Sequence, residues 1–159
     1  MMKIVILMIF WVLSISLNRA GCSQDDSATM VFKNEINGTN DTTGKKMRII
    51  IGSDVFSAIL NDNVTASALK AMLPLTISMS ELNGNEKFNY LPTTLPVNVS
   101  GGGNIQVGDL MLYDNNCLVL FYKSFHTSYS YTRIGRINNT SGLVAALGKG
   151  EVTVRFEME

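Results

Sequence analysis

Hydrophobic and polar positions alternate along most of the chain after residue 46, which is the pattern of strands that place one face on a core. The alternation is cleanest at the carboxyl end, where Val152, Val154, Phe156 and Met158 are separated by charged or polar residues. A period of two predicts a β-strand. Similar patterns, bounded by Gly, Pro, Asn and Asp, predict further strands over residues 47–51, 55–60, 75–79, 87–91, 105–107, 110–113, 117–122 and 129–137.

Two short helices interrupt this pattern. The first has apolar residues at spacing i, i+3 and i+4; Asp62 or Asn63 can cap its amino end, and Pro74 ends it. The second covers residues 143–147 and stops at Gly148. Many short strands joined by turn residues predict a mainly β fold, a closed or nearly closed antiparallel β-barrel of about eight strands with two short helices.

Residues 1–21 have the features of a secretory signal peptide of the lipoprotein type. A basic start precedes a 14-residue apolar run, which is too short to cross a bilayer as a helix, since that takes about 20 residues. Ala20-Gly21-Cys22 then resembles a bacterial lipobox, although Arg19 stands where that pattern has an aliphatic residue. We expect cleavage before Cys22 and lipidation of this cysteine; ordinary secretion and an uncleaved anchor are the alternatives.

The rest of the chain divides into a tether and a folded domain. Residues 22–45 are rich in Ser, Thr, Asn, Asp and Gly and have few apolar side chains to bury, so we interpret them as a flexible tether. Residues 46–159 then form one folded domain. The predicted location is the bacterial cell envelope, with a lipid on Cys22 as the membrane contact, and a periplasmic or secreted protein is the alternative.

Composition excludes several classes of function. Removal of the first 22 residues takes away Lys3 and Arg19 and leaves 11 basic and 13 acidic side chains, so the domain lacks the positive footprint of a nucleic-acid-binding protein. Two cysteines exclude a scaffold stapled by disulfides. The sequence has no phosphate-loop or dinucleotide glycine pattern, and its single histidine, His126, has no metal ligands at suitable spacing. No cofactor and no metal site are therefore predicted.

The densest group of aromatic residues lies between residues 108 and 137. On alternating strand positions, about half of these rings should pack in the barrel interior, and the others can line a groove. The candidate ligand-binding residues are Tyr122, Phe125, His126, Tyr129, Tyr131 and Arg133. No residue is assigned a catalytic role. Cys117 is interpreted as a buried apolar side chain, and Glu81 and Glu86 as solvated carboxylates beside a turn.

The chain resembles bacterial cyclophilin-like domain proteins in the hairpin and helix over residues 47–74 and in the runs LTISMSELNG, GDLMLY, CLVLFYKSF, TSYSYTRIGRI and SGLVAALGKGEVTVRF. The resemblance covers about residues 46–157 and implies a cyclophilin-type antiparallel barrel whose ends are closed by helices. Cyclophilins that isomerise prolyl bonds have a Phe-His-Arg motif followed by Gln-Gly-Gly-Asp. Here Phe125-His126 is followed by Thr127, and the triple glycine at 101–103 lies upstream. The resemblance therefore implies the fold without the isomerase activity.

These observations favour a lipid-anchored binding module whose groove holds a small molecule or a peptide against the aromatic segment. The substitutions Tyr129→Ala and Tyr131→Ala are expected to abolish binding without unfolding the domain. An enzyme, either a divergent peptidyl-prolyl isomerase or another activity that uses the groove, is the first alternative. A structural or assembly protein without a ligand is the second.

Overall fold

The computed structural model describes residues 45–159. The predicted signal peptide, Cys22 and all of the tether except Lys45 lie outside the described residues. Neither helix in the described part of the chain has the length and apolar character needed to cross a bilayer.

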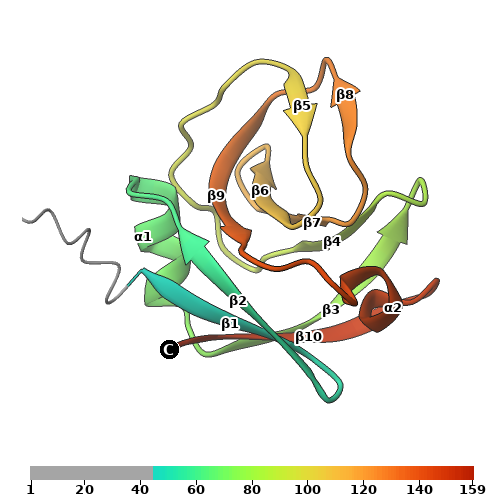
Figure 1. The fold of residues 1–159 in the computed structure, drawn as a ribbon. Helices are drawn as coiled ribbons and strands as arrows, with labels where there is room; N and C mark the ends of the chain where they lie inside the picture. The colour runs from blue at the N-terminus through green and yellow to red at the C-terminus, as the bar shows by residue number, and fades with distance from the viewer. Residues whose placement is uncertain (1–44) are drawn as a thin grey trace, which may run out of the picture. The chain divides into compact units, whose positions relative to one another are not determined.

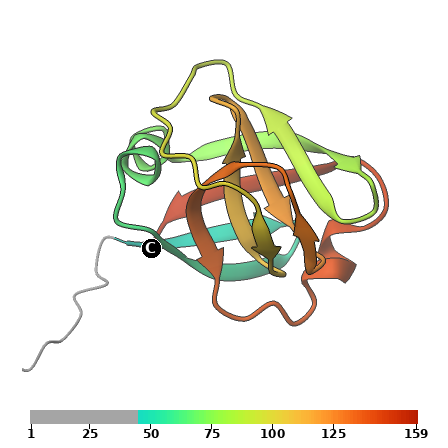
Figure 2. The same ribbon diagram turned by 90° about the horizontal axis from the view of Figure 1, so that it is seen from above.

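Eight strands close into an antiparallel barrel, as Figures 1 and 2 show from two directions. Around the barrel the order is β1 (Lys46–Ile51), β10 (Val152–Met158), β3 (Leu75–Leu82), β4 (Glu86–Tyr90), β7 (Cys117–Phe121), β6 (Asp109–Tyr113), β9 (Tyr131–Ile137) and β2 (Asp54–Leu60). The mainly β, eight-stranded barrel predicted from the alternating pattern is therefore confirmed.

Two further strands form a small sheet of their own, outside the barrel order. They are β5 (Gly103–Ile105) and β8 (Phe125–Thr127), paired so that Asn104 lies opposite His126. The sequence pattern predicted β5 two residues too late and did not predict β8, because a three-residue strand has too few positions to show a period. The glycines before β5 permit a close approach: a Cβ on Gly102 would lie 2.9 Å from the Thr127 carbonyl oxygen.

Two short helices lie on opposite sides of the barrel in both views, α1 (Val64–Ala71) and α2 (Leu143–Leu147). Asn63 caps α1, since its side chain accepts a hydrogen bond from the backbone amide of Ala66 at 2.8 Å. Leu69 of α1 and Leu147 of α2 are buried in the main core, which fills the barrel interior. The two predicted helices are therefore confirmed as elements that pack onto the barrel core.

Strand β7 is buried on both faces. Leu118 and Leu120 belong to the main core, whereas Cys117, Val119 and Phe121 belong to a second hydrophobic cluster. Successive side chains of a strand point to opposite faces, so the second cluster lies on the outside of the barrel wall. We call it the outer core; its buried members are Ile105, Met111, Cys117, Val119, Phe121 and Tyr131.

A lysine is among the largest fully buried side chains of the described residues. Lys87 on β4 pairs with Leu120, whose side chain is in the main core, and none of the lysine is exposed. Its ammonium lies 2.8 Å from Glu81 Oε2, donates to the Gly150 carbonyl oxygen at 2.5 Å, and sits 5.8 Å from the centre of the Tyr122 ring. Buried charges need such partners, because removal from water is costly.

Glu81 joins three elements at this end of the barrel. Its Oε1 accepts hydrogen bonds from Tyr122 Oη at 2.7 Å and from the Gly84 amide at 2.8 Å. Burial by itself would raise the pKa of Glu81, but the hydrogen bonds from Lys87, Tyr122 and Gly84 outweigh it and lower the pKa overall. Glu81 was interpreted as a solvated turn carboxylate; the structure shows it as the counter-charge of a buried lysine.

The substitution Glu81→Gln should destabilise the protein by about 2–4 kcal/mol, because it leaves the Lys87 ammonium in the barrel without its anionic partner. Urea unfolding of the purified protein at pH 7 measures this change. The double variant with Lys87→Met should recover part of the loss. Asp62→Asn is the matched control: it breaks the exposed pair with Lys45 and should cost less than about 1 kcal/mol. Equal costs for the two single substitutions would contradict this account.

Candidate functional site

The outer face of the barrel carries a cleft of about 660 Å³. It lies over β4 and β7 and is bounded by the turn after β3 and by the segment that contains β8. The lining residues are Leu82, Asn83, Asn85, Glu86, Phe88, Tyr90, Tyr113, Cys117, Val119, Phe125, His126, Thr127, Ser128, Tyr129 and Tyr131. A hollow of this size, mostly aromatic and apolar with a few polar groups, has the character of a small-ligand site.

The alternation of β4 produces one wall of this cleft. Glu86, Phe88 and Tyr90 occupy every second position of the strand and all line the cleft. Lys87, between them, points into the barrel instead. The strand therefore presents one charged residue to each side, and a one-residue change of register would exchange them.

A chain of five aromatic rings runs beside the cleft, and four of them, all except the buried Phe121, line it. Ring centres are 5.7 Å apart for Phe125 and Phe121, 5.4 Å for Phe121 and Tyr131, 5.5 Å for Tyr131 and Tyr113, and 6.2 Å for Tyr113 and Tyr129. These spacings and the tilted or edge-to-face arrangements are the favourable ones for aromatic pairs. The chain of rings connects β8, β7, β9 and β6, and these contacts fix the positions of the four rings that line the cleft.

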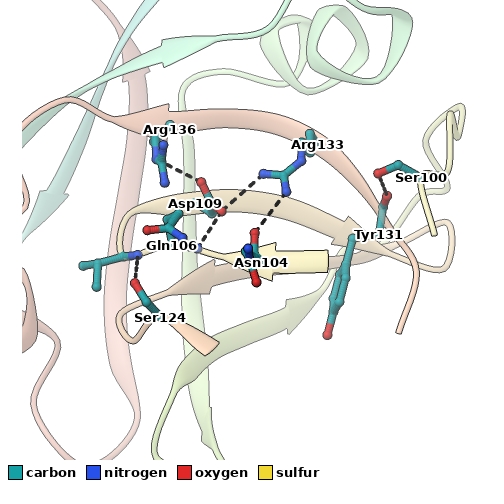
Figure 3. A network of polar contacts seen from close by, with 9 residues as sticks. Ser100, Asn104, Gln106, Asp109, Ser124, Tyr131, Arg133 and Arg136 are labelled. Atoms are coloured by element: carbon teal, nitrogen blue, oxygen red, sulfur yellow. Dashed lines mark hydrogen bonds and ion pairs between the residues drawn. The ribbon is translucent and has the colours of Figure 1, made fainter. Parts of the chain in front are cut away.

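The buried carboxylate of Asp109, on β6, holds the segment after β5 close to β9 (Figure 3). Asp109 Oδ1 lies 3.0 Å from Arg136 Nε, and its Oδ2 lies 3.3 Å from Arg133 Nη1 and accepts a hydrogen bond from the Gln106 amide at 2.9 Å. Arg133 also donates from Nη2 to the Asn104 carbonyl oxygen at 3.3 Å. The contacts tie β5, and with it the paired strand β8, to the barrel.

Four of the six candidate ligand-binding residues line the cleft: Phe125, His126, Tyr129 and Tyr131. The other two lie elsewhere. Tyr122 packs in the main core and donates to Glu81, and Arg133 holds Asp109 and the β5 backbone. His126 is exposed, and its Nδ1 lies 3.2 Å from Asn104 Oδ1.

Tyr131 and Tyr129 differ in exposure. The Tyr131 side chain is 8 % exposed and belongs to the outer core, whereas Tyr129 is 63 % exposed at the rim of the cleft. Truncation of a buried aromatic side chain typically costs about 3–5 kcal/mol. Contrary to the expectation from the sequence, Tyr131→Ala should therefore destabilise the fold, and Tyr129→Ala is the substitution that separates binding from stability.

Glu86 is a cleft residue that was interpreted from the sequence as a solvated carboxylate beside a turn. The residue is 7 % exposed, and within residues 45–159 no group forms a hydrogen bond or an ion pair with its carboxyl. Burial, together with the negative charge of Glu81, raises the pKa of Glu86 from 4.5 to about 7. A signal was present in the sequence, because Glu86 shares a strand face with Phe88 and Tyr90.

Two other titratable groups of the cleft are neutral at pH 7. Burial, then the charges of Glu86 and Asp114, raise the pKa of the Cys117 thiol to about 11. Burial and the same Glu86 charge raise the pKa of Tyr131 to about 12. Cys117 is thus the buried apolar side chain that was predicted, and no thiolate is available for attack. Within the described residues, no three His, Cys, Asp or Glu side chains come together as a metal site would require.

Comparison with known proteins agrees with this architecture. A family model described as "Cyclophilin-like family" matches residues 49–157. The solution structure of a hypothetical protein from Archaeoglobus fulgidus is similar, with a TM-score of 0.52 and 17 % sequence identity, and the match covers 72 % of this chain and 95 % of that one. At this identity the similarity concerns the fold alone. No curated protein matches the chain.

The substitution Glu86→Gln should change the dependence of stability on pH. A carboxyl whose pKa is raised by folding contributes stability that is complete below its ordinary pKa and is lost as the pH rises through the raised value. The protein should therefore lose stability between pH 4.5 and about 7 because of Glu86. Glu86→Gln removes this loss and should be the more stable form at pH 8, by at most about 3 kcal/mol at 1.36 kcal/mol per pKa unit.

Urea unfolding at pH 4.5 and pH 8 measures the difference. The exposed Asp54, which lies on β2 and does not line the cleft, supplies the matched control Asp54→Asn. The account is wrong if Glu86→Gln and the unmodified protein differ by the same amount at both pH values.

Proposed function

The chain belongs to the cyclophilin-like family, and we propose that its domain is a binding module that holds a small molecule or a peptide segment in the cleft. The observation that carries this proposal is the cleft itself. It is about 660 Å³ in volume, and the aromatic rings on one side of it pack against one another. The rings at its rim are open to solvent.

Exposed tyrosines at the rim support a binding role. Tyr90, Tyr113 and Tyr129 are 64 %, 41 % and 63 % exposed, and all three line the cleft. Tyrosine offers a large contact area with a polar end, and it loses little conformational entropy on binding. Clustered exposed rings beside a hollow are uncommon on a surface without a binding partner.

The arrangement favours binding over prolyl isomerisation. Phe125 and His126 line the cleft, but no arginine is among the lining residues of the described chain. An isomerase of the cyclophilin type has an arginine directly after that Phe-His pair, and here Thr127 takes this position. The thiol of Cys117, which lines the cleft, is neutral at pH 7 and is therefore a poor nucleophile.

We further propose that the module is held in the bacterial cell envelope by a lipid on Cys22. The support lies in the sequence: the 14-residue apolar run, the Ala20-Gly21-Cys22 ending and the polar segment 22–45, which can act as a tether. Acyl chains contribute about 0.8 kcal/mol per buried CH₂, so more than one chain on the cysteine would give stable attachment.

Intact mass of protein extracted from membranes tests the lipid anchor. The chain should begin at Cys22 and carry a lipid-sized increment, and Cys22→Ser should release the protein into the soluble fraction. A soluble, unmodified chain would refute the anchor without affecting the proposal for the cleft.

The substitution Tyr129→Ala should weaken binding in the cleft by about tenfold, or about 1.4 kcal/mol, without lowering the thermal midpoint. 4-Ethylphenol is a suitable neutral probe, and amide NMR shifts of the purified protein report where it binds. The shifts should fall on the cleft residues. Val55→Ala, at an exposed position of β2 outside the cleft, is the control and should leave the affinity unchanged. Binding that ignores Tyr129, or shifts confined to other faces, would contradict the proposal.

A further inference from the structure

We propose that the cleft selects an organic cation, a molecule that places an ammonium group against Glu86 and its apolar or aromatic body against the surrounding rings. This inference rests on the proposed binding function and narrows it to one class of ligand.

The charges that line the cleft have one sign. Among the described residues 45–159 that line the cleft, Glu86 is the only one with a carboxylate, and none is a lysine or an arginine. The nearest lysine along the strand, Lys87, points into the barrel, where it is bound to Glu81 and Gly150. Arg133 is likewise engaged away from the cleft by Asp109. Among the described residues that line the cleft, a cationic guest would therefore meet a negative group and neither a lysine nor an arginine; Lys123 Nζ lies beyond the lining, next to Gly84 in the turn that bounds the cleft.

Two acceptors at this wall lack donors in the described chain. Glu86 as a whole residue is 7 % exposed, and within the described residues its carboxyl receives no hydrogen bond. Asn85, which also lines the cleft, has a buried Oδ1 without a hydrogen-bond partner. A buried acceptor such as Asn85 Oδ1 is almost always satisfied in folded proteins, and an unsatisfied one is costly. An ammonium group has only donors, so it supplies what this wall lacks.

The rings of the cleft suit the same guest. Six aromatic side chains line it: Phe88, Tyr90, Tyr113, Phe125, Tyr129 and Tyr131. The face of an aromatic ring attracts a cation, and the attraction strengthens where water is excluded. An anionic guest would instead meet the charge of Glu86 in a partly desolvated space. Aromatic side chains around a carboxylate are thus complementary to an organic cation.

Recognition by Glu86 should depend on pH. The titratable groups that interact with its charge are Glu81 from β3, Cys117 from β7 and Tyr131 from β9, and His126 from β8 lines the same cleft. Burial and Glu81 raise the pKa of Glu86 to about 7, so only roughly a tenth of it is ionised at pH 6. A cation binds the ionised form, and its affinity should rise roughly tenfold between pH 6 and pH 8.

Tyramine and 4-ethylphenol form the test pair, because they share the phenol ring and differ in the ammonium group. Affinities of the purified protein are measured by NMR titration at pH 8. Tyramine should bind at least tenfold more tightly than 4-ethylphenol. Glu86→Gln should remove this difference while 4-ethylphenol binds as before, and Asp54→Asn, an exposed carboxylate outside the cleft, should keep it.

The other possible results distinguish a failure of the cation proposal from a failure of the binding module. Equal affinities for the two compounds, or a tyramine preference that persists in Glu86→Gln, overturn the cation proposal while 4-ethylphenol binding still upholds the binding module. Tyramine affinity that does not change between pH 6 and pH 8 in the unmodified protein overturns it without any substitution. Absence of binding by both compounds contradicts the binding module and the inference together.

Discussion

Burial of both faces of β7 is the constraint on which the cleft depends. A barrel strand needs only its inner face covered, yet every residue from Cys117 to Phe121 is at most 4 % exposed. The inner residues Leu118 and Leu120 pack in the main core. The outer residues require a second cover, because apolar surface of this extent is unfavourable in water. The small β5–β8 sheet and the ring chain through Tyr131 provide that cover.

The cover extends over β7 but leaves β4 partly open, and this difference makes the hollow. The two strands are paired from Glu86–Phe121 to Tyr90–Cys117. On β4, Phe88 packs against the outer core, whereas Tyr90 is exposed. The part of the cleft formed by β4 therefore changes from covered to open along the strand. The Asp109 contacts hold β5 in place on the other side. The hollow is therefore a consequence of how the barrel wall is covered.

Two glutamates of the β3–β4 hairpin, Glu81 and Glu86, have pKa values shifted in opposite directions by their surroundings. Glu81 faces the Lys87 ammonium and hydrogen-bond donors, and its pKa is lowered although burial acts in the other direction. Glu86 faces rings and a thiol, and its pKa is raised to about 7. The first is structural, since it makes a buried lysine tolerable. The second is available to a ligand, since nothing in the described chain binds it.

The sequence predicted the barrel well and the site only in part. Strand alternation and turn residues identify the barrel strands, and the ordered runs identify the family. Of the aromatic segment, Phe125, His126, Tyr129 and Tyr131 line the cleft, and their role in binding stays a prediction. Tyr122 lies in the main core instead. The sequence could not show on which side of the barrel wall Tyr122 lies, because β7, which precedes it, is apolar at every position. Without alternation, the inner and outer faces of this strand cannot be distinguished.

Glu86 was missed for a different reason. Beside an Asn-Gly turn, a carboxylate is usually solvated, and only the three-dimensional pairing of β4 with β7 shows that this one is covered. Arg133 was a reasonable candidate beside aromatic residues, but Asp109, a distant residue in sequence, determines its position. The burial of Glu86 and the position of Arg133 thus depend on contacts between residues far apart in the sequence, which a local sequence pattern does not reveal.

A ¹³C NMR titration of the Glu86 side-chain carboxyl tests the central claim most directly, since it observes the carboxyl that lines the cleft without a partner in the described chain. The account predicts a midpoint near pH 7, displaced downward when tyramine is present, because a bound cation stabilises the ionised form. A midpoint near the ordinary value of 4.5, unchanged by tyramine, would contradict it.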